Sequence, residues 1–166
     1  MDHLWSPWRY HYLVGAEGKA PGCIFCNLPK QDRDEENLIV HRGLHNFVIL
    51  NRFPYTSGHA MVVPYRHLDR LHLLDEVEAS EMMRLSKLLE MHMREIYKPD
   101  GLNLGMNLGE SAGAGIAGHI HMHILPRWSG DSNFMTTVGE TRVLPEDLDV
   151  TWKRLSKAFS TGEGQR

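Results

Sequence analysis

The chain has 166 residues, of which 42% are hydrophobic and 23% charged, a profile typical of one soluble globular domain. Its net charge of −3, with no basic block, excludes a protein that coats nucleic acid polymers. No apolar run approaches the roughly 20 residues needed to cross a bilayer, so we expect no membrane partner. With two cysteines and no signal-peptide pattern, we expect a cytoplasmic location.

Residues 1–21 form the first segment, which we expect to be an ordered N-terminal arm. The segment contains four large aromatic residues, Trp5, Trp8, Tyr10 and Tyr12. So many large aromatics would be unfavourable in a free tail, because their apolar surface would stay in water.

Three short apolar runs follow, and they predict strands at 38–40, 47–50 and 60–63. The second and third runs are joined by a segment that contains Pro54, Ser57 and Gly58. These are turn-forming residues, so the segment is predicted to be the loop of an antiparallel pair.

The next element is a helix that begins at a capping box formed by Asp75 and Glu78. Lys98 and the residues up to Gly101 end it. Two further strands are predicted near 102–107 and 119–125, and a short helix at 145–159. The apolar faces of the two helices are expected to be Val77, Met82, Leu85, Leu89, Met93 and Ile96, and Leu148, Trp152, Leu155 and Phe159.

Three histidines, His119, His121 and His123, alternate with apolar residues in the fifth predicted strand. Side chains alternate between the faces of a strand, so the three imidazoles should share one face. The pattern has three interpretations: an exposed polar face, a catalytic metal site, or a nucleophilic histidine with helpers. We favour the nucleophile, because neutral imidazole attacks phosphorus well and has a pKa suited to proton transfer at neutral pH.

A small-residue loop at 109–118 directly precedes the histidines. Backbone N–H groups without side-chain bulk can approach phosphate oxygens closely. The loop lacks the lysine of a Walker motif and the strand-to-helix context of a dinucleotide fingerprint. A flexible connector is the alternative interpretation.

The run from Gly118 to Arg127 resembles the motif of the histidine triad (HIT) family. The segments 51–54 and 58–64 resemble the hairpin that precedes this motif in the family. The segments 5–9, 23–26 and 126–134 resemble a bacterial branch related to diadenosine tetraphosphate phosphorylase and ATP adenylyltransferase.

The resemblance implies an α+β, HIT-like fold, with a five-stranded antiparallel sheet in each subunit of a homodimer. One main helix and a short C-terminal helix complete the subunit. The expected organisation is an arm at 1–21, a HIT domain at 22–130, and a C-terminal extension with a short helix at 131–166.

The same resemblance assigns roles to individual residues. His121 would be the nucleophile, with its Nδ1–H held by the backbone carbonyl of His119. His123 would bind phosphate and assist the leaving group. Asn107, Ala114 and Gly115 would contact the phosphates. Asn51 would bind the ribose, Ile49 would line the base pocket, and Trp128 would flank a second nucleotide.

The function implied is nucleotidyl transfer or hydrolysis on dinucleoside polyphosphates through a covalent nucleotidyl-histidine, with phosphate or water as the acceptor. Related hydrolases commonly carry Gly-Gln where this chain has Ala114 and Gly115. The missing amide is compatible with phosphate as the acceptor, so we favour a phosphorylase. A metal-centred nucleotide hydrolase and a non-catalytic nucleotide-binding module are the alternatives.

Cys23 and Cys26 have the spacing of a structural zinc site, which needs two further ligands. By resemblance to zinc-bearing members of the family, these would be His67 and His119. Two free thiols or a redox pair are the alternatives. His59 is expected only to support the hairpin turn.

Overall fold

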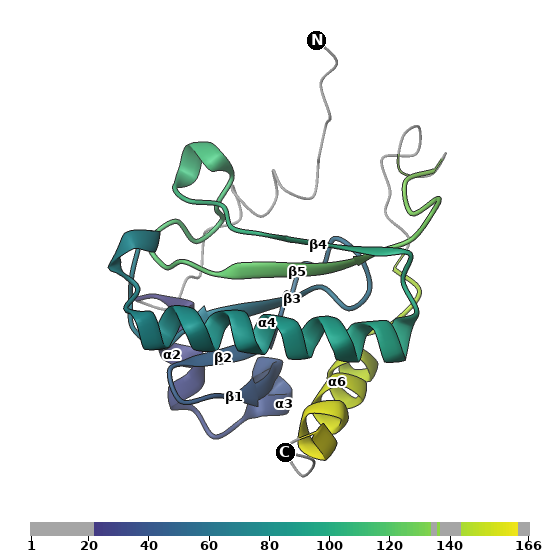
Figure 1. Ribbon diagram of the computed structural model, residues 1–166, viewed down its shortest axis with the longest axis horizontal. Coiled ribbons are helices and arrows are strands. Elements are labelled where there is room, and N and C mark those ends of the chain that lie inside the picture. Colours follow the sequence, from purple (N-terminus) through teal and green to yellow (C-terminus); the bar gives the residue numbers. More distant parts are fainter. Residues whose placement is uncertain (1–21, 134–135, 137–143, 163–166) are drawn as a thin grey trace.

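The computed structural model describes residues 22–133, 136 and 144–162, and within them the chain forms a five-stranded sheet with helices on it (Figure 1). The predicted arm at 1–21 and part of the C-terminal extension lie outside these residues. The sheet order is β1-β2-β3-β5-β4, and every neighbouring pair is antiparallel. The strands are β1 (Ile39–Arg42), β2 (Asn46–Leu50), β3 (Ala60–Pro64), β4 (Gly101–Gly105) and β5 (Met122–Arg127). This confirms the predicted α+β class.

The main helix, α4 (Glu76–Tyr97), lies across one face of the sheet and contacts β2, β3 and β5 (Figure 1). It begins at the predicted capping box. The Asp75 side chain accepts a hydrogen bond from the Glu78 N–H, and the Glu78 side chain accepts one from the Asp75 N–H. The helix ends where Lys98 takes a left-handed conformation with φ 46°. One predicted core residue is wrong. Val77 is 56% exposed, because Glu78 takes the inward position of the first turn.

The C-terminal helix α6 (Leu148–Gly162) packs on α4 and β1. It buries Leu155 and Phe159 as predicted, and its Trp152 Nε1–H donates to the Ile39 carbonyl at 2.7 Å. Short helical pieces of three or four residues were not predicted, because such lengths show no periodicity. They are α2 (Ile24–Asn27), η1 (Leu28–Lys30), α3 (Asp34–Asn37), η2 (Leu71–Leu73) and η3 (Glu110–Ala112). No helix in the described part of the chain is long and apolar enough to cross a membrane.

The last strand differs from its prediction, since β5 begins at Met122 and not at His119. The Ile120 N–H donates to the Leu68 carbonyl at 2.7 Å instead of to a neighbouring strand. His119 and His121 therefore precede the strand, and only His123 belongs to it.

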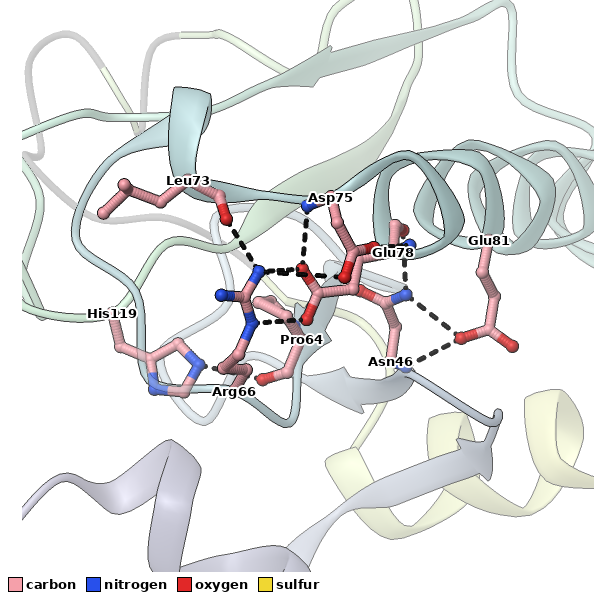
Figure 2. A network of polar contacts seen from close by, with 8 residues as sticks. All are labelled: Asn46, Pro64, Arg66, Leu73, Asp75, Glu78, Glu81 and His119. Carbon is pink, nitrogen blue, oxygen red and sulfur yellow. Dashed lines mark hydrogen bonds and ion pairs between the residues drawn. The ribbon is translucent and has the colours of Figure 1, made fainter.

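A buried carboxylate, Glu81 of α4, holds the turn between β1 and β2. It accepts hydrogen bonds from the N–H groups of Leu44, His45 and Asn46 and from the Asn46 Nδ2, and Figure 2 shows its contact with Asn46. Burial raises the pKa of this carboxyl group, but the backbone and side-chain hydrogen bonds outweigh burial and lower the pKa to about 2.

Replacing Glu81 with glutamine should lower the free energy of unfolding by about 2–3 kcal/mol at pH 7. The NH2 group of the new side chain would face the backbone and Asn46 donors that the carboxylate now accepts from. A carboxyl group with a lowered pKa stabilises the fold above the unfolded value near 4.5 and loses this contribution towards pH 2. Denaturant titrations should therefore show the difference between the two proteins shrinking below about pH 4.5. Glu90→Gln, which removes an exposed pair with Arg94, is the control and should cost no more than about 0.5 kcal/mol. A difference between wild type and Glu81→Gln that is independent of pH would contradict this role.

Candidate active site

One row of residues across the sheet supplies part of the floor of a cavity through Ile49, Met61 and His123. Ile49, Met61, His123 and Gly105 are register partners on β2, β3, β5 and β4 in turn. Because side chains alternate along each strand, this row points to one face, and its neighbours Val48, Val62 and Met122 point to the other. A cavity of about 590 Å³ lies on the first face, and no residue of α4 lines it.

The cavity brings together seven of the eight predicted catalytic and substrate-binding residues: Ile49, Asn51, Asn107, Ala114, Gly115, His121 and His123. The remaining one, Trp128, does not line it. Trp128 follows the far end of β5, where its ring lies edge-on to Tyr97 at 6.4 Å between centroids. Further walls come from the apolar side chains of Ile24, Phe25, Leu28 and Leu38.

His121 is oriented by the backbone of the residue two positions before it. Its Nδ1 lies 2.8 Å from the His119 carbonyl oxygen, which can only accept, so Nδ1 carries the proton. Burial lowers the pKa of His121, with the bond to His119 opposing it, so the ring is neutral at pH 7. The remaining nitrogen, Nε2, therefore keeps a lone pair that can attack an electrophile.

His123 is oriented by a chain of hydrogen bonds that sequence analysis missed. The Tyr55 N–H donates to the His59 Nδ1 at 3.1 Å, so a neutral His59 carries its proton on Nε2. This Nε2–H donates to the His123 Nδ1 at 2.9 Å, which places the proton of His123 on Nε2. Burial, followed by the nearby charge of His121, lowers the pKa of His123 to about 4. His123 is thus a neutral donor beside His121, with 4.8 Å between ring centroids.

His59 is therefore more than a support for the hairpin. It is 1% exposed, and its ring lies 5.1 Å from that of His123. The sequence placed His59 in the hairpin motif but gave no sign of its partner, which lies 64 residues away along the chain.

The glycine-rich loop presents backbone donors to the cavity. Gly109 and Gly113 have φ values of 86° and 90°, which side chains disfavour, and they shape the turn around η3. The N–H groups of Gly115, Ile116 and Ala117 donate to no group among the described residues, and all three residues line the cavity. Such free amides can hold phosphate oxygens.

Four potential metal ligands meet beside the cavity: Cys23, Cys26, His67 and His119. Their ligand atoms all lie within 4.8 Å of one another. His119 Nδ1 lies 3.3 Å from Cys23 Sγ, 3.6 Å from Cys26 Sγ and 3.3 Å from His67 Nδ1, and Cys26 Sγ lies 3.3 Å from His67 Nδ1. A tetrahedral zinc ion with usual bond lengths separates such ligand atoms by about 3.3 to 3.7 Å.

The hydrogen bond of His119 also fits a metal ligand. Its Nε2–H donates to the Pro64 carbonyl at 2.9 Å, as Figure 2 shows, so Nδ1 faces the thiols without a proton. Burial lowers the pKa of His119 to about 4, which keeps the ring neutral. The four residues therefore fit a structural Cys2His2 zinc site.

The metal-ligand cluster and the cavity share helix α2. Phe25 lies between the two cysteines in sequence, lines the cavity, and packs 5.5 Å from the His119 ring and 5.1 Å from the His121 ring. Fixing the cysteines would therefore fix this wall of the cavity.

Comparison with known proteins finds the HIT domain over residues 33–130. The chain is 39% identical to AP-4-A phosphorylase from Mycobacterium tuberculosis, over 96% of this chain and 85% of that protein. Among solved structures, a Zn-bound histidine triad family protein from Mycobacterium smegmatis superposes with a TM-score of 0.70 at 25% identity, covering 87% of this chain and 98% of that one. A hypothetical histidine triad nucleotide-binding protein from Sulfolobus tokodaii superposes with a TM-score of 0.67 at 28% identity, covering 84% of this chain and 93% of that one.

Proposed function

The chain belongs to the histidine triad (HIT) family, and from this premise we propose that it cleaves dinucleoside polyphosphates such as diadenosine tetraphosphate through a nucleotidyl group on His121. The observation that carries the proposal is the His121 Nδ1–H bond to the His119 carbonyl, because it leaves Nε2 as a nucleophile in the cavity. The 39% identity to an AP-4-A phosphorylase supports this substrate class.

In the first step, His121 Nε2 forms a bond to the phosphorus of one nucleotidyl group, and the bond from that phosphorus to the bridging oxygen breaks. The neutral His123 donates an Nε2–H hydrogen bond to the departing oxygen, which leaves as the anion of ATP when the substrate is diadenosine tetraphosphate. The acceptor then attacks the phosphorus of the nucleotidyl-histidine, the bond from that phosphorus to His121 Nε2 breaks, and the proton of the acceptor passes to the product phosphate or to solvent. Inorganic phosphate yields ADP, whereas water yields AMP.

The rest of the cavity positions the substrate. The free N–H groups of Gly115, Ile116 and Ala117, together with Asn107, hold phosphate oxygens as charge develops on them. Asn51 holds the ribose, and Ile49 lies against the base. Trp128 keeps the proposed role of flanking a second nucleotide, although it lies outside the cavity of this chain.

We propose zinc as the ion bound by Cys23, Cys26, His67 and His119. Four protein ligands leave no position for water, so the ion would cross-link α2 to the segments of His67 and His119 and take no part in the chemistry. The closed ligand set also argues against a metal-centred hydrolase. The homodimer and the cytoplasmic location stay predictions.

The acceptor can be identified from the products. Incubating the full chain with diadenosine tetraphosphate should give ATP and ADP when inorganic phosphate is present, and little product without it. Anion-exchange chromatography of the nucleotides measures this, with diadenosine triphosphate and nucleoside phosphoramidates as comparison substrates. ATP and AMP in equal amounts without phosphate would identify a hydrolase, and nucleotide binding without any product would identify a binding module.

A further inference from the structure

Asn37, the last residue of α3, lines the cavity and has no role in the mechanism above. It is 9% exposed and lies directly before Leu38, which has a left-handed φ of 62° and also lines the cavity. Leu38 in turn is tied to β2, because its carbonyl accepts the Leu50 N–H at 2.9 Å. Asn37 is therefore a buried polar group held on a fixed wall.

The orientation of the Asn37 amide follows from its partners. Nδ2 lies 3.4 Å from the Leu28 carbonyl and 3.3 Å from the Gln31 Oε1. A backbone carbonyl can only accept, so the NH2 group must face it, and Oδ1 must point away. The 28–31 turn thus holds the donor side of the amide and leaves the acceptor side free.

No described residue donates a hydrogen bond to the Asn37 Oδ1. The oxygen is also not shut away from solvent. The described side-chain atoms that are both buried and unpartnered are Asn46 Oδ1, Ser57 Oγ, His92 Nδ1 and Ser156 Oγ, and Asn37 Oδ1 is not among them. Asn37 lines the cavity, and its Oδ1 is an unoccupied acceptor with access to solvent.

This acceptor lies at the end of the cavity remote from the histidines. The sheet row from His123 runs through Met61 and Ile49 to Ile39, which is three strands and about 14 Å away. Asn37 precedes Ile39 by two residues, and apolar side chains of Leu28 and Leu38 lie beside it. With phosphate at the histidines, this end receives the base.

We propose that Asn37 determines base specificity by accepting a hydrogen bond from an exocyclic amino group, the 6-amino group of adenine. This inference rests on the proposed function, since it takes the cavity to be the nucleotide site. A base with a 6-oxo group would set two acceptors against each other, and a base with hydrogen there would leave Oδ1 unpaired.

The test compares the binding of AMP, IMP and purine riboside monophosphate to the full chain by titration calorimetry. Wild type should bind AMP about 10-fold or more tightly than either analogue. In Asn37→Ala, the ratio should fall to about one, whatever happens to the affinity for all three. Gln31→Ala is the matched control, because it removes a partner of Nδ2 and keeps Oδ1, so the preference for AMP should remain.

Asn37→Asp separates base recognition from support of the turn, because it keeps an acceptor oxygen and loses the Nδ2 donor. It should retain a preference for AMP even if the 28–31 turn loosens and all affinities drop. An unchanged AMP preference in Asn37→Ala, or no preference in wild type, would overturn the inference while leaving the proposed function intact. If wild type binds no nucleotide, the proposed function fails, and the inference fails with it.

Discussion

Replacing His121 with alanine should lower the turnover of diadenosine tetraphosphate by about 10³-fold or more, because the variant has no group to receive the nucleotidyl moiety. The effect should fall on kcat, since the loop amides and Asn51, which we propose hold the substrate, remain. Steady-state kinetics with product chromatography measures it. Rapid acid-free quenching of wild type with radiolabelled substrate should also show a protein-bound nucleotidyl group that the variant lacks.

Two controls separate lost chemistry from lost structure. His72→Ala changes an exposed histidine of η2 and should keep wild-type turnover. His121→Ala itself should keep its metal content and its melting temperature within a few degrees, because His121 is not among the four metal ligands. Turnover near the wild-type rate in His121→Ala would rule out the covalent mechanism.

Replacing His119 with alanine should have the opposite profile, with loss of the metal and a fall in melting temperature of about 10 °C or more. His119 is 0% exposed and lies within 3.6 Å of both thiols and of His67. Its loss opens the site and removes the bond to Pro64 that fixes this segment. Elemental analysis of metal per chain and thermal melts followed by circular dichroism measure the two effects.

Chelation of the wild-type protein tests the same site without mutation. If the ion is structural, activity should decline only in step with the circular dichroism signal or the melting temperature. Immediate loss of turnover in a protein that is still folded would instead place the metal in the chemistry. A stoichiometric metal in His119→Ala would show that the four residues do not form the site.

Local patterns in the sequence were enough to predict much of this protein. The capping box at Asp75, the apolar periodicity of α4 and α6, and the apolar runs of the strands depend on neighbours within a few residues, so they can be found without coordinates. The histidine run and the Cys-x-x-Cys pair are equally local, and the resemblance they carried identified the HIT family.

Tertiary structure decided how these pieces act on one another. His59 contacts His123 across 64 residues, and the start of β5 depends on the bond from Ile120 to Leu68. The orientation of the Asn37 amide likewise depends on the turn it faces, and the position of Trp128 outside the cavity depends on where β5 ends. Ring tautomers, amide orientations and cavity walls are set by partners distant in sequence, whose positions follow from strand register and packing. For that reason the sequence predicted which residues carry the chemistry, and only the folded chain decided how their nitrogen and oxygen atoms are oriented.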